Sequence, residues 1–397
     1  MRKLLLGTTA LAAAATLTAN AALADVTIAG SYEFKYLSRS SNVSTLDGTT
    51  MTHGDTDMVV NFTNKTDSGL DLTFRYDIGA VGSTDGGNLT IDEASLAIAG
   101  GFGKVVLGMD DDAADAYNID EMDLIAEEPS ATMTSSSISL NSSISSDDAM
   151  KVAYHLPAMG GLTAGISHTD RSAAGGTDTT SYGAKYSMDA AGASITLDIG
   201  YTTQATDQET GDGGTLTGNV YGSGQEAGVT IKYDALQIGV YGAERENKAH
   251  TSGVAVDATT DEFNGVWYAK YSMGPVSIGY SESYVDSGVS ETQTVATTTA
   301  KTLRTSGGIF EGEQIGIAFN VNDNLSISYS ESTETYDAQD DATTAIADVD
   351  QEIDAIQVAY SMGGMSIKAY QMDVTNPNFD EDATDAGKTE IALGLAF

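Results

Sequence analysis

The stretch Leu70-Asp71-Leu72-Thr73-Phe74-Arg75-Tyr76-Asp77-Ile78 alternates apolar and polar side chains at every position. A repeat of two residues places successive side chains on opposite faces of an extended chain, as in a β-strand that separates two environments. The same alternation runs through residues 26–36, 229–233 and 266–280. Beyond the N-terminal segment no 3.6-residue period of useful length occurs, so the sequence predicts an all-β fold.

The connections between these candidate strands alternate between two kinds, one tight and one long. Eight tight connections and nine long polar ones would join 18 strands, and all connections of one kind would lie at the same end of an antiparallel sheet. The tight connections lie at residues 64–69, 100–103, 157–161, 189–192, 234–235, 274–275, 322–324 and 363–364, and the long ones at roughly 38–54, 79–88, 110–147, 171–180, 202–224, 246–260, 286–308, 336–350 and 374–386.

This asymmetry favours a membrane barrel over a soluble sandwich, whose loops show no consistent short–long order. The candidate strands have about 9–12 residues, which suits a tilted strand that crosses a bilayer. Since every backbone group in hydrocarbon must be paired within the protein, a sheet can span only if it closes. Residues 25–397 are therefore predicted to form an antiparallel transmembrane β-barrel with short periplasmic turns and long extracellular loops. A secreted β-solenoid or adhesin and an array of sandwiches stay as alternatives.

The first 24 residues have the features of an export signal. Arg2 and Lys3 precede an apolar stretch at residues 4–17, and Ala22-Leu23-Ala24 has the small-x-small form that signal peptidase accepts. We expect a signal peptide at residues 1–24, cleaved before Asp25, and a mature protein in the cell outer membrane. An uncleaved N-terminal membrane anchor is the alternative.

Composition excludes several functions. Asp and Glu number 57 against 18 Lys and Arg, so the formal net charge is −39 and the long-range field would repel nucleic acid. No cysteine is present, which excludes disulfides, thiolate zinc sites and a cysteine nucleophile. With 41% hydrophobic residues and 19 tyrosines the chain is not a disordered polyelectrolyte.

The polar and apolar faces of the predicted strands carry different side chains. A cation on the lipid face would cost about 2–4 kcal/mol at the midplane, so basic residues are expected on the polar, lumen-facing side. Tyrosines on the apolar face near the tight turns suggest an aromatic girdle, unless they reflect β propensity alone. The cations are Lys35, Arg75, Lys104, Lys151, Lys185, Lys232, Arg245, Lys270 and Lys368, and the tyrosines are Tyr154, Tyr186, Tyr233, Tyr271 and Tyr360.

With these features the sequence resembles the Gram-negative general porins, in particular the alphaproteobacterial branch. The segments Thr63–Leu70, Gly101–Gly108 and Ile391–Phe397 are similar to the turn between the second and third strands, the fifth strand and the closing strand of that family. The resemblance implies a homotrimer in contact with outer-membrane lipid and lipopolysaccharide, and a terminal Phe397 that the outer-membrane assembly machinery reads. It also implies 16 strands, whereas the turns of this sequence count 18.

The resemblance further implies that the third long connection, residues 110–148, folds into the pore as a constriction loop. Between Val105 and Met150 this connection carries only acidic charges. Family members place basic side chains on the wall across from the loop, and the matching positions are Lys35 and Arg75, with Arg39 nearer the rim. The acids are Asp110, Asp111, Asp112, Asp115, Asp120, Glu121, Asp123, Glu127, Glu128, Asp147 and Asp148.

Such a loop would set a negative potential in a narrow neck, and we expect the pore to prefer cations. The alternative is an ordinary solvated acidic loop. The run of three acids at residues 110–112 could collect a hard divalent cation such as Ca²⁺, although its spacing is not that of an EF-hand loop. No other cofactor is expected.

Signals for catalysis fail on inspection. The four histidines lie far apart, Ser167-His168-Thr169-Asp170 holds the residue types of a triad without its geometry, and Gly101-Phe102-Gly103-Lys104 lacks the Ser or Thr and the helix of a phosphate loop. The sequence therefore predicts a channel for passive diffusion of ions and small hydrophilic solutes rather than an enzyme. A substrate-selective porin and a non-channel surface protein or adhesin are the alternatives.

Overall fold

The computed structural model of the chain describes residues 25–40, 48–54, 56–80, 90–117, 149–170, 178–204, 220–249, 261–286, 308–338 and 348–397. The predicted signal peptide and most of the long connections lie outside these ranges. Within them every regular element is a strand or a short 3-10 turn. No helix in this described part of the chain is long and apolar enough to cross a membrane.

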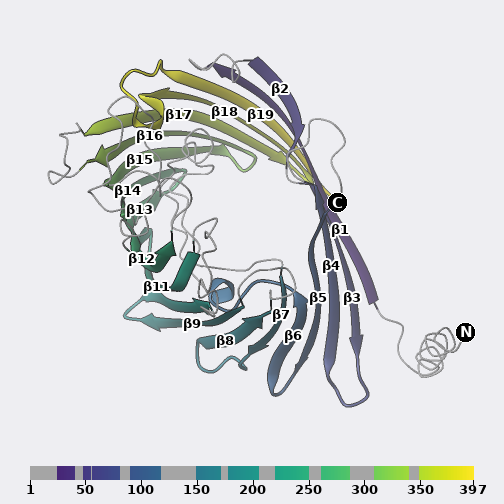
Figure 1. Cartoon of the computed structure of the whole chain (residues 1–397). Coiled ribbons are helices and arrows are strands. Elements are labelled where there is room, and N and C mark those ends of the chain that lie inside the picture. Colours follow the sequence, from purple (N-terminus) through teal and green to yellow (C-terminus); the bar gives the residue numbers. More distant parts are fainter. Residues whose placement is uncertain are drawn as a thin grey trace, which may run out of the picture.

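The strands follow one another around a single sheet in chain order (Figure 1). Two 3-10 turns, η2 (Asp115–Tyr117) and η6 (Pro377–Phe379), interrupt the connections. The strands are β1 (Asp25–Ser40), β2 (Gly48–His53), β3 (Thr56–Lys65), β4 (Asp71–Ala80), β5 (Thr90–Gly100), β6 (Gly103–Met109), β7 (Met150–His155), β8 (Leu162–Thr169), β9 (Thr179–Ala190), β10 (Ala193–Gln204), β11 (Val220–Tyr233), β12 (Leu236–Ala249), β13 (Glu262–Met273), β14 (Val276–Asp286), β15 (Ile309–Asn322), β16 (Leu325–Asp337), β17 (Val349–Met362), β18 (Met365–Thr375) and β19 (Ala386–Ala396).

The sheet closes on itself, because β1 pairs antiparallel with β19 from Ser31↔Ala396 to Ser40↔Gly387. Beyond this pairing, the Phe397 N–H donates to the Gly30 carbonyl at 2.8 Å. All neighbouring strands are antiparallel, and closure leaves no open edge that lipid would have to satisfy.

The strand number follows from the other side of β1, which pairs first with β2 and then with β3. The register runs from Phe34↔His53 to Gly30↔Met58, so β2 and β3 are one strand with one extra residue at a bulge. Counted in this way, the 19 segments form an 18-stranded closed barrel. The prediction of 18 strands from the turn count is confirmed, and the usual family number of 16 does not apply.

Two of the tight turns contain residues with a left-handed backbone. Ala191 and Gly192 both have positive φ, 51° and 85°, between the paired residues Ala190 and Ala193. Two positive φ angles in a two-residue loop match the right-handed twist of a hairpin. Asp234, with φ 52°, occupies the same place in the hairpin of β11 and β12.

The two faces of the barrel differ as the alternation predicts. On β15 the side chains of Ile315, Ile317 and Phe319 are exposed on the outer face, each by about half of its surface. On the adjacent β16 the residues of the opposite face are Ser328, Ser330 and Ser332, all buried inside the barrel. An outer apolar surface of this kind needs lipid to cover it.

The outer face changes from apolar to acidic towards the long-loop end of the barrel. Along β15 the outward residues Glu311 and Glu313 precede Ile315, and along β17 Asp354 precedes Ile356. Aromatic side chains bond to these carboxylates at the boundary. The Tyr329 hydroxyl donates to Asp354 Oδ1 at 2.6 Å, and Trp267 Nε1 and the Tyr280 hydroxyl donate to Glu282 at 2.8 and 2.7 Å. The boundary marks where the hydrocarbon layer ends.

This assignment predicts the cost of charges on the outer face. Ile317→Arg should lower the free energy of unfolding by about 2–4 kcal/mol, because the guanidinium would lie in the middle of the apolar part of β15. Denaturant titration of the barrel in lipid vesicles measures the change. Glu311→Arg is the control on the same strand and face, and beyond the boundary it should cost less than about 1 kcal/mol. Equal losses would contradict the placement of the lipid belt.

Candidate functional site

The third long connection begins with a turn that its own side chains stabilise. After β6 the Asp112 carboxylate accepts hydrogen bonds from the N–H groups of Ala114 and Asp115 at 3.0 and 3.2 Å. The Asp112 carbonyl accepts from Ala116 N–H at 2.9 Å, which starts η2. An Asp that bonds to the backbone two and three residues onward is a common start of such a turn. Asp112 is fully buried by this arrangement.

The turn is held against the inner wall of the barrel. The Ala113 N–H donates to Ser167 Oγ on β8 at 2.8 Å. The Tyr117 hydroxyl lies 2.7 Å from His155 Nδ1 and donates to the Ala164 carbonyl at 3.1 Å. Burial raises the pKa of Tyr117, so the hydroxyl stays neutral at physiological pH. Residues 110–117 therefore enter the barrel interior, where Figure 1 shows the blue 3-10 turn inside the curve of the strands.

Glycines on the wall make room for this turn. A Cβ at Gly183 of β9 would overlap the carbonyl oxygen of Ala113, and a Cβ at Gly165 of β8 would stand 2.9 Å from Cε2 of Tyr117. Only glycine allows the loop backbone to approach the strands this closely. Neither glycine was predicted to be part of the site, although both occupy inward positions of the alternation.

The first acids of the loop lie beside Arg75. The Arg75 guanidinium contacts Asp77 Oδ2 at 2.6 Å and Glu93 Oε2 at 3.0 Å, and its side chain is 42% exposed. Carboxylate oxygens of Glu93, Asp110 and Asp111 lie within 4.8 Å of one another. The loop acids were expected across the pore from Arg75, but Asp110 and Asp111 start the loop on the same part of the wall. Arg75 thus lies between the carboxylates of Asp77 and Glu93, which would otherwise repel one another.

The other predicted wall cations lie near the closure of the barrel. Lys35 Nζ contacts Glu33 at 2.9 Å and Glu390 at 3.9 Å. Arg39 is paired in register with Lys388 of β19, and the buried Lys388 contacts Glu390 at 3.5 Å. Lys388 was not predicted as a site residue, although it lies on the same polar face of the closing strand as Glu390. The two-residue spacing of Lys388 and Glu390 already indicates that they share a face.

Further charges line the inner wall. Lys151 and Arg245 are buried on the polar face, as predicted, whereas their acidic neighbours were not foreseen from the sequence. The Tyr241 hydroxyl donates to Glu226 Oε2 at 2.6 Å, and Arg245 Nη1 contacts Glu262 Oε1 at 3.3 Å with both side chains buried. Asp198 and Glu226 lie over glycines of the neighbouring strands, where an added Cβ would overlap their carboxylates. Lys151, also buried, donates to the Asp110 carbonyl. The wall is therefore closely lined with ionisable groups.

The remaining predicted loop acids belong to residues 118–148, outside the described part of the chain. Asp115 is described and belongs to η2, with the N–H contact to Asp112 given above. The residues that lie outside are Asp120, Glu121, Asp123, Glu127, Glu128, Asp147 and Asp148.

Comparison with known families agrees with this architecture. Residues 7–258 match the model of a family described as Gram-negative porin. The chain belongs to the Gram-negative porin family. The family predicted from the sequence is thereby confirmed, and the porin is a channel-forming β-barrel of the outer membrane. A search of curated proteins finds no match.

Solved structures share the fold at low sequence identity. OprD of Pseudomonas aeruginosa has 12% identity and a TM-score of 0.56, over 96% of this chain and 97% of its own. An anion-selective porin from Comamonas acidovorans has 12% identity and a TM-score of 0.53, over 94% and 100%. A triple mutant of the Rhodopseudomonas blastica porin has 13% identity and a TM-score of 0.52, over 94% and 100%. These likenesses concern the fold alone.

The close approach of the turn to the glycines of β8 and β9 leads to a prediction for the porin. Gly183→Ala should lower the mean single-channel conductance, because the new Cβ pushes the turn at residues 112–117 away from β9 and into the lumen. Recordings in planar lipid bilayers measure this. The control Gly242→Ala adds a Cβ whose nearest neighbour is 3.7 Å away, so its conductance should equal that of the unmodified porin. A Gly183→Ala porin with unchanged conductance would contradict the close contact between this turn and β9.

Proposed function

We propose that this porin lets ions and small hydrophilic solutes diffuse passively across the outer membrane and prefers cations to anions. The observation that carries the preference is the charge balance at the start of the third loop. Four acids gather around one guanidinium on the inner wall: Asp77 and Glu93 contact Arg75, and Asp110 and Asp111 lie beside Glu93.

The physical basis is the field inside a narrow aqueous neck. Low-dielectric protein walls focus the field lines of the charges that line them, so an excess of carboxylates concentrates cations and depletes anions. Lys151 adds a second positive charge at the Asp110 carbonyl, which still leaves acids in the majority at this place. The buried inner-wall acid Asp198 acts in the same direction.

Two other functions predict different recordings. A substrate-selective porin would show conductance that one solute blocks at saturating concentration. A structural surface protein or adhesin would show no ohmic conductance at all. The family membership favours a channel over the adhesin, and the many paired charges of the wall favour broad passage over one defined solute site.

Assembly and export complete the proposal. We infer a homotrimer in contact with lipid and lipopolysaccharide, as the family resemblance implies. We also infer removal of the signal peptide before Asp25, on the strength of the small-x-small sequence at residues 22–24. The ring of Phe397 is 80% exposed at the end of the closing strand, so the outer-membrane assembly machinery could reach it.

We also propose that the porin acts without catalysis. Ser167 and His168 occupy opposite faces of β8: Ser167 is bonded to the loop turn inside the barrel, while His168 bonds outside to Thr180. A catalytic pair of this serine and histidine would need both side chains on one face.

A positive charge is already present at this group of acids, because the Arg75 guanidinium contacts Glu93 of β5, which lies beside Asp110 and Asp111. We therefore expect open-channel conductance and reversal potential in planar bilayers to be the same before and after treatment with EDTA. A loss of conductance that Ca²⁺ restores would instead assign a structural calcium ion to Glu93, Asp110 and Asp111.

Charge reversal at Arg75 tests the proposed selectivity. In a tenfold KCl gradient the unmodified porin should give a cation-selective reversal potential, below the limit of about 59 mV for a single permeant charge. Arg75→Glu should move it further towards that limit, because a fifth carboxylate joins the cluster. An anion-selective value for the unmodified porin would refute the preference.

The matched control is Lys65→Glu, the same charge change on an exposed residue whose partner Asp71 lies beside the tight turn at residues 66–69. A charge at the wide rim is screened within about 8 Å at physiological salt, so this variant should shift the potential much less. Equal shifts in the two variants would remove Arg75 from the selectivity-determining part of the pore.

A further inference from the structure

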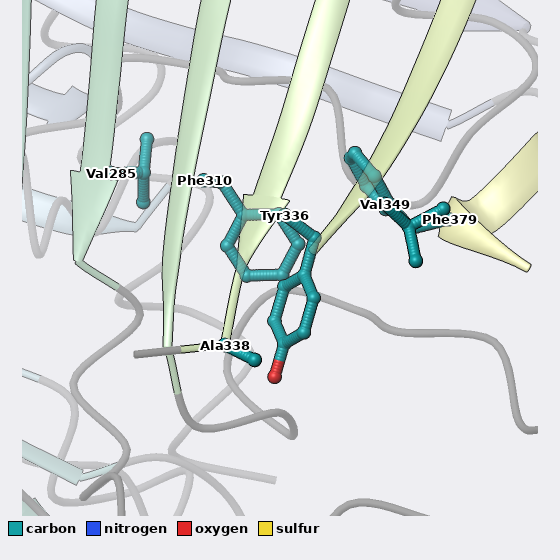
Figure 2. Packing of buried hydrophobic residues seen from close by; sticks show 6 residues of the cluster. All are labelled: Val285, Phe310, Tyr336, Ala338, Val349 and Phe379. Atoms are coloured by element: carbon teal, nitrogen blue, oxygen red, sulfur yellow. The ribbon is translucent and has the colours of Figure 1, made fainter. Parts of the chain in front are cut away.

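Part of the inner wall is apolar, which is unexpected for a water-filled barrel. Near the long-loop end, neighbouring strands β14 to β17 carry inward side chains that form a buried cluster (Figure 2). Phe310 and Tyr336 have no exposed surface. Apolar side chains on a lumen wall stay dry only if another segment covers them. The six residues of the cluster are Val285, Phe310, Tyr336, Ala338, Val349 and Phe379.

Part of the cover comes from the connection between β18 and β19. Phe379 of this connection is fully buried, and its ring centroid lies 5.3 Å from that of Phe310 and 6.3 Å from that of Tyr336. Phe310 belongs to β15 and Tyr336 to β16. The chain that leaves β18 therefore runs back across the inner face of β17 before it enters β19.

Hydrogen bonds fix the same segment to β17. The Asn378 N–H donates to Gln351 Oε1 at 2.8 Å, and the buried Gln351 in turn donates from Nε2 to Glu334 Oε2 at 2.7 Å. The side chain of Asn376 donates to the Asp350 carbonyl at 2.8 Å. A segment with both apolar and polar anchors holds one position relative to the wall.

Three residues of this segment have a left-handed backbone. The contacts of the segment with the wall must compensate for this strain. Asn376, Asn378 and Phe379 have φ angles of 50°, 59° and 54°. Asn adopts this region readily, but for an aromatic residue the left-handed conformation is unfavourable. Burial of the Phe379 ring between two aromatic rings compensates for this cost. The strain points to a segment selected for its position rather than for the shortest connection.

The exposed side of the segment is acidic. Glu381, Asp382 and Asp385 are exposed, Asp380 is half-buried, and no Lys or Arg occurs in residues 376–387. We propose that residues 376–385 form a second selectivity element of the porin, at its long-loop mouth, which attracts small cations and cationic solutes and repels anions. This proposal rests on the proposed channel function and adds a filter separate from the third loop.

Cysteine labelling tests this placement cleanly because the chain has no cysteine of its own. The probe is trimethylammonium-ethyl methanethiosulfonate, which attaches a cation to Asp382→Cys through a disulfide. Labelling should lower the single-channel conductance by roughly a quarter or more and shift the reversal potential towards anions, because bulk and positive charge enter the ion path.

The control is Asp373→Cys, which replaces another acid at the end of β18. Asp373 is exposed and pairs in register with the outward Asp354, so the same label there should leave conductance and potential unchanged. Mass spectrometry confirms that both variants are labelled. A labelled Asp382→Cys porin with unchanged recordings, or one that resists labelling, would overturn the proposal.

The role of Phe379 as the aromatic anchor of the segment is tested in the labelled Asp382→Cys porin. Phe379→Ala should replace the single labelled conductance level by several levels, because the segment loses its seat, whereas Phe379→Leu should keep one level. Indistinguishable recordings for the two would overturn the anchoring role. An unmodified porin that does not conduct would refute the proposed function and this inference with it, while a conducting porin with an insensitive Asp382→Cys refutes this inference alone.

Discussion

The backbone hydrogen bonds between β1 and β19 are the interaction on which the rest of the structure depends. In hydrocarbon an unpaired N–H or carbonyl costs several kcal/mol, so one open seam would cancel much of the stability of the sheet. The seam is closed by ten paired positions and continues to Gly30 and Phe397. The bulge between β2 and β3 lets one strand cover both halves of β1 on its other side. Closure then divides all side chains into an outer and an inner set.

The inner set has to solve a packing problem that the outer set does not have. Outer side chains meet fluid lipid, whereas inner side chains meet one another and the loops that enter the lumen. On this wall, carboxylates lie over glycines, as Glu226 does over Gly200, and cations such as Arg75 lie between acids. Each such contact fixes a charge in place, which a pore needs if its field is to act on passing ions. Charge pairing therefore shapes the lumen as much as it stabilises it.

Strands and strand number could be predicted from the sequence because alternation and turn chemistry are local. The contact of Arg75 with Asp77 follows from a spacing of two residues on one strand, but its contact with Glu93 depends on the register between β4 and β5, which no local pattern reveals because a long connection joins the two strands. The position of the third loop against the wall likewise depends on Gly183, which lies on β9, two strands beyond the end of the loop. Phe310 did carry a signal, since it is apolar on the side of β15 that otherwise holds Gly312 and Gln314.

The two inward segments are held by different forces, and neither force is the one that sets ion selectivity. The third loop is seated by hydrogen bonds on a glycine wall, and the last connection by aromatic rings. Neither seat depends on long-range charge, whereas the fields of the acids that they present are screened over about 8 Å at physiological ionic strength. Rising salt should therefore weaken the selectivity of the pore without moving the segments that set its width. Because the anchoring contacts are separate from the charged side chains, the width of the pore stays constant while its ion selectivity changes with salt.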